Sequence, residues 1–241
     1  MSAKDKYFVL IGGGEIRNKT TLKIDEYIAR LAKIRAEGDR PRALFIGTAS
    51  HDFMPYFNSF RKTYTGELNV KVDCLLTVYT TYGLEKIKEK FDLCDVIYVG
   101  GGDTLFMIEK WKEIGIIDLI KDAYERGVII CGLSAGAICW FDDIYTDSAE
   151  NDTAKYAFAK GLGIIKDACS PHYNLRKVDL FNAFSTSGLN SMLAIEDDCA
   201  LIYKNEKLSG SFSAGGNAYV LRNNGGTVEE YLINDITGET L

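Results

Sequence analysis

Ser134 has the strongest sequence context for nucleophilic chemistry. It stands in Gly132–Gly136, a G-x-S-x-G pattern that follows the apolar run Val128–Cys131. Such a pattern between a buried strand and a helix is typical of a nucleophile elbow, where a sharp turn projects the serine and small neighbours let strand and helix approach. The N–H of Ala135 would then lie at the helix amino terminus, where it can stabilise an oxyanion. The alternative interpretation is that Ser134 caps the helix.

A serine nucleophile needs a base, and the sequence contains two histidines, His51 and His172. Pro171 stiffens the backbone beside His172, which suits a positioned side chain. His172 also follows Ser134 by 38 residues, which is room for one crossover connection. We therefore expect His172 to be the base, and we keep His51 as the alternative or as a residue that lines the pocket.

Two acidic regions could supply the residue that orients the histidine. The first follows the expected elbow helix and contains Asp142, Asp143, Asp147, Glu150 and Asp152. The second, Glu196–Asp198, ends the expected strand Met192–Ile195. An acid at a strand end is well placed to meet a histidine on the loop of the neighbouring strand. Each acid, taken alone, could equally belong to a solvated turn.

Two glycine-rich turns, Gly12–Gly14 and Gly100–Gly102, follow expected strands. Neither is a dinucleotide fingerprint, because the sixth position, which must be glycine, is Arg17 in one and Leu105 in the other. Neither continues into the Gly-Lys-Ser/Thr of a phosphate loop. Ligands of open α/β sheets bind where strands end, so backbone N–H groups in these turns could hold an anion or an oxyanion. The alternative is that both are simple tight turns.

The elements that must position these residues alternate along the chain. Apolar strands are expected at 7–11, 43–47, 70–76, 96–99 and 128–131, and helices at 20–36, 53–64, 84–91, 103–112 and 115–126. This alternation predicts an α/β fold with a mostly parallel central sheet and helices on both faces. Short strands are then expected at 192–195, 200–203, 207–212, 218–221 and 228–232, as an antiparallel extension of the same sheet. Since no Pro- or Ser-rich linker interrupts the pattern, we expect residues 1–241 to form one domain.

Composition excludes several functional classes. The 241 residues are 46% hydrophobic, 26% charged and 12% aromatic, a balance that excludes global disorder. No apolar run reaches the roughly 18 residues of a membrane-spanning helix, and the first residues do not read as a signal peptide. The net charge of −6, from 28 basic and 34 acidic residues, argues against nucleic acid or anionic membrane as partners.

The six cysteines include no C-x-x-C pair, and most lie in apolar runs. This usage favours free, buried thiols and a cytoplasmic protein. With two histidines and unpaired cysteines, the sequence offers no cluster of metal ligands, so neither a metal nor another cofactor is expected.

Together these motifs resemble the peptidase E (α-aspartyl dipeptidase) and cyanophycinase group of serine peptidases, whose α/β fold is like that of class I glutamine amidotransferases. The matching stretches occur in the order of that family and cover most of the chain. They are Ile11–Gly14, Val99–Thr104, Gly132–Ala137, Pro171-His172 and Ile195–Leu201.

The resemblance implies that Ser134 is the nucleophile, that His172 is the base, and that Asp197, which best matches the family's glutamate, is the acid. An older family assignment implies instead an acid near Asp147 or Ser148. The resemblance also implies an oxyanion hole, in which a backbone N–H near Gly101 or Gly102 acts together with that of Ala135.

Substrate contacts are implied at Gly13, at Asp103, where the family turn usually has Asn, and at Arg176, in a stretch where peptidase E has arginines that read an anionic group. The implied activity is hydrolysis of short peptides, including Asp-Xaa dipeptides, through an acyl-enzyme. One alternative is a β-aspartyl or isopeptide hydrolase like cyanophycinase, and another is a non-catalytic binding module for small molecules on the same fold. A conventional α/β-hydrolase esterase fits less well, because its order of Ser, acid, His would need an acid between Ser134 and His172.

Overall fold

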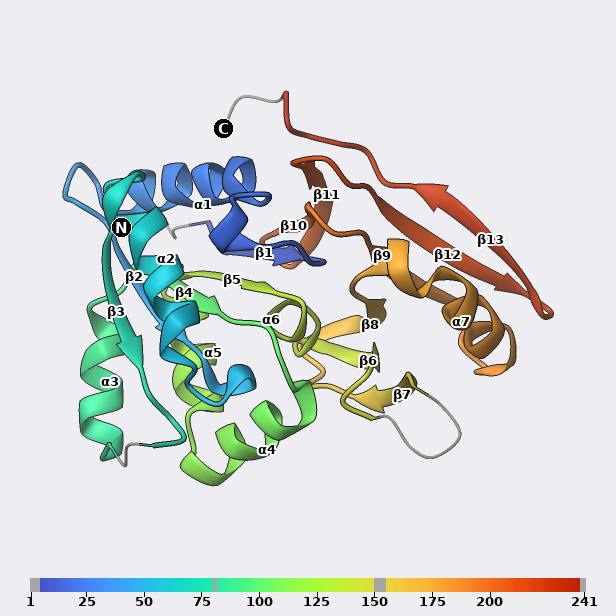
Figure 1. Cartoon of the computed structure of the whole chain (residues 1–241), viewed down its shortest axis with the longest axis horizontal. Coiled ribbons are helices and arrows are strands. Elements are labelled where there is room, and N and C mark those ends of the chain that lie inside the picture. Colours follow the sequence, from blue (N-terminus) through green and yellow to red (C-terminus); the bar gives the residue numbers. More distant parts are fainter. Residues whose placement is uncertain (1–4, 80–81, 150–154, 239–241) are drawn as a thin grey trace.

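The computed structural model describes residues 5–79, 82–149 and 155–238 (Figure 1). One sheet contains β1 (Tyr7–Ile11), β2 (Arg42–Ile46), β3 (Lys71–Leu75), β4 (Val96–Val99), β5 (Ile129–Leu133), β10 (Cys199–Lys204) and β11 (Lys207–Ser213). A second sheet contains β6 (Phe141–Thr146), β7 (Ala157–Lys160), β8 (Ile165–Ser170), β9 (Ser191–Ile195), β12 (Ala218–Asn224) and β13 (Thr227–Leu232). The helices are α1 (Leu22–Arg35), α2 (Met54–Gly66), α3 (Leu84–Asp92), α4 (Thr104–Ile114), α5 (Ile117–Glu125), α6 (Ala135–Ile138) and α7 (Tyr173–Thr186).

The first sheet has the strand order β11-β10-β1-β5-β4-β2-β3, and its five strands from β1 to β3 pair in parallel. Phe8 and Leu10 of β1 belong to the core formed with α3, α4 and α5, while Val9 and Ile11 belong to the core formed with α1 and α2. Successive side chains of a strand point to opposite faces, so a strand that is covered on both sides must be apolar throughout. This requirement explains the continuous apolar run in the sequence and confirms the predicted sheet with helices on both faces.

The carboxyl-terminal strands correct one prediction. They pair antiparallel as expected, but they are divided between the two sheets. Strand β10 pairs with β1, and β11 with β10, so these two extend the first sheet. Strands β9, β12 and β13 belong to the second sheet, in the order β13-β12-β9-β8-β6-β7. All five segments are short strands between turns, and the sequence of such a strand does not specify which neighbour it will join.

The segment between the elbow and β9 was largely missed by the sequence prediction. It forms β6, β7, β8 and α7. Strands β6, β8 and β9 are neighbours in a parallel arrangement. Helix α7 buries Leu180 and Phe184 on one face of this sheet, together with Met192 and Ala194 of β9. Leu193 and Ile195 of β9 point to the other face and join the core of the first sheet.

The two sheets therefore share a core, and Figure 1 shows the second sheet with α7 to one side of the first. In the described part of the chain, no helix has the length and apolar character needed to cross a membrane. All six cysteines are free thiols, and all except Cys74 are buried, as expected from their place in apolar runs.

Candidate active site

Ser134 lies in a turn with the geometry of a nucleophile elbow, between β5 and α6. Its backbone has φ +53° and ψ −108°, a combination that residues other than glycine seldom adopt. The turn depends on glycine, because a Cβ at Gly132 would lie 2.4 Å from the Gly136 carbonyl oxygen, and one at Gly136 would lie 2.1 Å from that of Val99. The Ser134 N–H donates to the Ile11 carbonyl at 2.9 Å. Its side chain makes no capping hydrogen bond, so the helix-cap interpretation has no support.

His172 stands between Ser134 and Asp197. Its Nε2 is 2.8 Å from Ser134 Oγ, and its Nδ1 is 2.6 Å from Asp197 Oδ1. The arrangement follows from the second sheet, because β8 and β9 pair in parallel and end together. His172 follows β8 by two residues, and Asp197 follows β9 by two. The structure thus brings together three side chains that are distant in sequence.

Asn174 holds the Asp197 carboxylate in place. Its Nδ2 donates to Asp197 Oδ2 at 3.1 Å, and its Oδ1 accepts from the Asp197 N–H at 3.0 Å. The hydrogen bond from His172 holds the pKa of Asp197 below its usual value, with a smaller contribution from Asn174, against the opposing effect of burial. The sequence analysis missed Asn174. The available signal was its position two residues after His172, in the first turn of α7.

The neighbours of Asp197 point elsewhere, although the segment is not extended: β9 ends at Ile195, and residues 197–198 form a turn in which Asp198 has φ +57°. The Glu196 carboxylate accepts from the N–H of Asn217 at 2.8 Å. The Asp198 carboxylate accepts from Thr20 Oγ1 at 2.5 Å. Both residues therefore support loops around the site, and neither contacts His172.

The earlier acidic region is engaged in ion pairs. Asp142 pairs with Lys166, Asp143 with Lys160, and Asp147 with Arg176, at 3.3, 2.7 and 3.2 Å. Ser148 Oγ accepts from the Thr104 N–H at 2.7 Å. Glu150 and Asp152 lie outside the described residues.

His51 is exposed and does not meet Ser134. Its ring lies 4.1 Å from that of Phe106, centroid to centroid, and it does not line the cavity that contains Ser134. The structure therefore places one of the two histidines, His172, beside the serine.

The first glycine turn supports the histidine and the acid. A Cβ at Gly13 would lie 1.8 Å from Asp197 Oδ1 and 2.3 Å from His172 Nδ1, so no larger residue fits there. The carbonyl of Gly12 accepts from the His172 N–H, and that of Gly13 accepts from the Asp198 N–H, both at 3.1 Å. Gly13 is thus in contact with the His172–Asp197 pair, and it does not line the cavity.

The second glycine turn lies against the serine. A Cβ at Gly101 would be 3.4 Å from Ser134 Cβ, and Gly102 has φ +139°. The Gly101 N–H makes a long hydrogen bond of 3.4 Å to Tyr56 Oη. Burial raises the pKa of Tyr56, so this phenol keeps its proton. Ala135 directly follows Ser134 as the first residue of α6, as predicted for an oxyanion donor.

A cavity of about 580 Å³ contains Ser134 and His172. Residues 14–17 and several residues between 53 and 59 form its walls, together with Gly101 and Gly102. None of the three predicted substrate contacts is in this lining: Gly13 lies against the His172–Asp197 pair, and Arg176 and Asp103 are engaged elsewhere. The Arg176 side chain is buried and donates to the Tyr145 carbonyl at 3.2 Å as well as to Asp147. Asp103 caps α4 by accepting from the Phe106 N–H.

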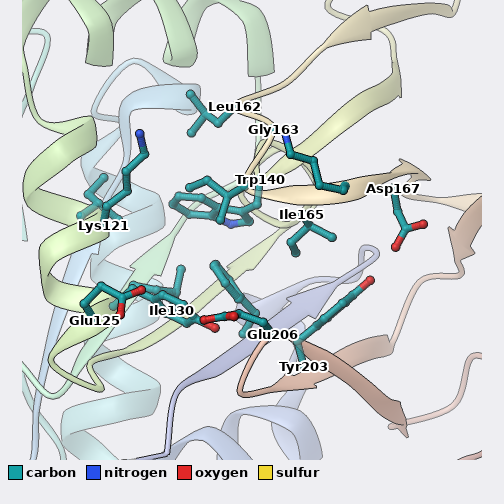
Figure 2. Close-up of a pocket in the computed structure, with 15 residues that line it drawn as sticks. Lys121, Glu125, Ile130, Trp140, Leu162, Gly163, Ile165, Asp167, Tyr203 and Glu206 are labelled. Atoms are coloured by element: carbon teal, nitrogen blue, oxygen red, sulfur yellow. The ribbon is translucent and has the colours of Figure 1, made fainter.

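A larger cavity, of about 770 Å³, lies away from this site (Figure 2). Figure 2 shows the rings of Trp140 and Tyr203 facing it, with Lys121 and Asp167 at its margin. Among the described residues that line it there is no Ser, Thr, Cys or His, so it does not offer the serine and histidine of a serine-type triad. It borders the first residues of β1 and β5, whereas Ser134 follows the last residue of β5.

The described ranges of the chain are residues 5–79, 82–149 and 155–238. Within these ranges no three His, Cys, Asp or Glu side chains gather closely enough to hold a metal ion.

Solved structures with a similar fold are peptidases. The chain superposes on a peptidase from an acI-B1 Actinobacterium with a TM-score of 0.72 and 18% identity, covering 98% of this chain and 96% of that one. It superposes on a putative peptidase E protein from Listeria monocytogenes EGD-e with a TM-score of 0.62 and 20% identity, covering 87% and 98%.

Sequence relatives point the same way. The chain is 32% identical over 216 residues to the uncharacterized peptidase YgaJ of Bacillus subtilis (strain 168), spanning 86% of this chain and 88% of that protein. It is 24% identical over 157 residues to peptidase E of Haemophilus influenzae (strain KW20 / Rd), spanning 63% and 70%. The model of peptidase family S51 matches residues 8–210. Because that match spans most of the chain, the protein belongs to peptidase family S51 and is a serine-type peptidase.

Proposed function

We propose that this peptidase hydrolyses short peptides through an acyl-enzyme formed on Ser134. The observation that carries the proposal is the hydrogen-bonded line from Ser134 Oγ through the imidazole of His172 to the Asp197 carboxylate. A nucleophile, a base and a group that orients the base are the three parts that serine hydrolysis requires.

In the acylation step, neutral His172 takes the Ser134 proton at Nε2 while Oγ attacks the peptide carbonyl carbon. The Nδ1–H donates to Asp197, which fixes the tautomer and stabilises the imidazolium. The lowered pKa of Asp197 supports this role, because the carboxylate is ionised at neutral pH. The backbone N–H of Ala135, with that of Gly101 or Gly102, stabilises the negative oxygen of the tetrahedral intermediate.

The imidazolium then gives its proton to the departing amine, and the carbon–nitrogen bond breaks. In the deacylation step, His172 takes a proton from water, and the resulting hydroxide equivalent attacks the ester carbon. Ser134 leaves and regains its proton from His172, which releases the acid product. A cavity of about 580 Å³ suits a peptide of a few residues.

Labelling with a fluorophosphonate probe tests the proposal. We expect the wild-type protein to be labelled at Ser134, which mass spectrometry of the labelled peptide would locate. Ser134→Ala should lose both the label and peptide turnover, by about six orders of magnitude for turnover. Ser59→Ala is the matched control, because Ser59 lines the same cavity but donates to the Pro55 carbonyl. Turnover that survives in Ser134→Ala would refute the mechanism.

A further inference from the structure

We propose that the preferred substrate is a dipeptide with free termini and uncharged, apolar side chains, whose carboxylate is bound by Arg17 and whose ammonium is bound by Glu15. This inference rests on the proposed function, because it names the substrate class of the same cavity. It differs from the expectation of an aspartyl substrate, which depended on an arginine after the histidine.

One part of the cavity wall is apolar. Phe53, Pro55 and Tyr56, at the start of α2, line it together with Ile16 and Leu133. The Phe53 side chain is 59% exposed although it borders the cavity. The exposed ring leaves apolar surface at the rim of the cavity that a bound ligand can cover. An aspartate carboxylate against this wall would lose water without gaining a partner.

The charges of the cavity match one carboxylate and one ammonium. Among the described residues that line it, Arg17 carries the single permanent positive charge and Glu15 the single negative charge. A dipeptide with neutral side chains carries one charge of each sign at its termini. An Asp-Xaa dipeptide adds a second carboxylate, for which the lining offers no second cation.

Arg176, the arginine that follows the histidine, cannot act as that second cation in this arrangement. Its side chain is 4% exposed, and its guanidinium donates to Asp147 and to the Tyr145 carbonyl. It also lies over the ring of Tyr156, 4.7 Å from the centroid. These contacts show that the Arg176 side chain belongs to the packing between β6 and α7.

Arg17 and Glu15 are held by one short turn. The 3-10 helix Ile16–Asn18 begins after Glu15, whose Oε1 accepts from the Arg17 N–H at 3.1 Å. This turn continues from Gly12–Gly14, which supports His172. The charged groups are therefore attached to the segment that positions the base. A guanidinium is suited to this task, since it binds a carboxylate through two parallel hydrogen bonds.

The first experiment compares kcat/KM for Leu-Leu, Asp-Leu and Leu-Leu amide with the wild-type enzyme. We expect Leu-Leu to exceed Asp-Leu by at least about tenfold, because the extra carboxylate is desolvated without a partner. We expect amidation, which removes the negative terminus, to lower kcat/KM by about 10- to 100-fold.

The second experiment uses matched variants. Arg17→Gln should raise KM for Leu-Leu by about tenfold and should remove the preference for the free acid over the amide. Arg61→Gln, an exposed arginine of α2 outside the cavity lining, should behave as wild type. Phe53→Ala should narrow the ratio of Leu-Leu to Asp-Leu turnover, whereas Ile34→Ala, an exposed apolar residue of α1, should leave it unchanged.

The outcomes separate this inference from the proposed function. If Ser134 is labelled by the fluorophosphonate and Asp-Leu is cleaved as well as or better than Leu-Leu, the inferred substrate class is wrong and the mechanism stands. If the acid and the amide are cleaved equally by wild type and by Arg17→Gln, the assignment of Arg17 is wrong. If Ser134 is not labelled and no peptide is cleaved, both proposals are overturned.

Discussion

The two sheets position their parts of the candidate site by different physical means. On the first sheet, the backbone sets the position of Ser134. Ser134 itself has a positive φ, and a Cβ added at Gly132 or Gly136 would collide with a carbonyl oxygen. On the second sheet, hydrogen bonds between side chains set the position of His172 and Asp197, and Asn174 adds two more.

This difference indicates which changes the fold can absorb. Shortening a side chain in the hydrogen-bonded half removes contacts but creates no overlap, so the fold should survive while activity falls. On the first sheet, adding a methyl group at one of the glycines beside Ser134 would push a carbonyl oxygen away. Stability and activity should therefore fall together. Gly13 connects the two halves, because it follows β1 of the first sheet and a Cβ there would meet both His172 and Asp197.

The largest effect is expected from His172→Ala. Removing the base should lower kcat by about a million-fold, as in other serine hydrolases that lose one triad member. The thermal unfolding midpoint should stay near that of wild type, because His172 belongs to the hydrogen-bonded half. His51→Ala is the control and should retain activity. A fully active His172→Ala variant would show that His172 is not the base.

Asp197→Asn should lower kcat by about 10⁴-fold, because the amide favours the wrong imidazole tautomer. Steady-state kinetics on a dipeptide would measure the loss. Glu196→Gln is the matched control, since Glu196 is the adjacent carboxylate and contacts Asn217 instead of His172. Equal losses in the two variants would mean that the acid is wrongly assigned.

Gly136→Ala should lower both stability and activity. The added Cβ would lie 2.1 Å from the Val99 carbonyl oxygen, so β4 or α6 must shift. We expect a destabilisation of about 1–3 kcal/mol from overpacking, and about a hundredfold lower kcat from displacement of Ser134. Gly66→Ala is the control, because a Cβ there meets nothing within 4 Å. Unchanged stability in Gly136→Ala would refute the account of the elbow.

Asn174→Ala should lower kcat/KM by about tenfold, through the loss of a hydrogen bond to a charged group. The loss should appear in kcat, with KM little changed, because Asn174 acts through Asp197 and does not line the cavity. Asn182→Ala, an exposed asparagine on the same helix, should have no effect. A change confined to KM would place Asn174 in substrate binding instead.

The smallest effect concerns stability and pH. The pKa of Asp197 is lowered in the folded protein, so its ionised form stabilises the fold. This contribution is present above the unfolded-state pKa of about 3.9 and is lost as pH falls through the folded-state value. The difference in unfolding midpoint between wild type and Asp197→Asn should therefore be constant near neutrality and shrink below about pH 4. A difference that grows on acidification would contradict the sign of the shift.

The sequence predicted the centre of the first sheet well because β1, β4 and β5 are buried on both faces and are apolar without interruption. Ser134 and His172 were chosen as candidates from a glycine-flanked motif and the scarcity of histidine, and the structure places Ser134 Oγ 2.8 Å from His172 Nε2. The acid could be narrowed to Asp197 only through a family resemblance, because Glu196 and Asp198 are chemically equivalent neighbours. Their distinction depends on which way a strand end faces, and this is fixed by pairing between β8 and β9.

Other features had no local signal. The second sheet was missed because β6 carries Asp142 and Asp143 among its apolar residues and does not read as a buried strand. Arg176 was expected to contact substrate, yet its ion pair with Asp147 depends on packing between α7 and β6. The role of Gly13 was also hidden, since the crowding that demands glycine comes from residues about 160 and 180 positions away.

The pairing of β10 with β1 has a consequence for how the protein is made. A ribosome delivers β1, the elbow and Ser134 well before Asp197, and strand β10, which borders β1, emerges later still. Gly216 is synthesised after β10. It packs against Asp197, because a Cβ added at Gly216 would lie 1.9 Å from the Asp197 carbonyl oxygen. During translation the chain therefore carries its serine without the partners that would activate it. The proposed mechanism therefore implies that peptidase activity waits until Asp197 and the strands that follow it have been synthesised.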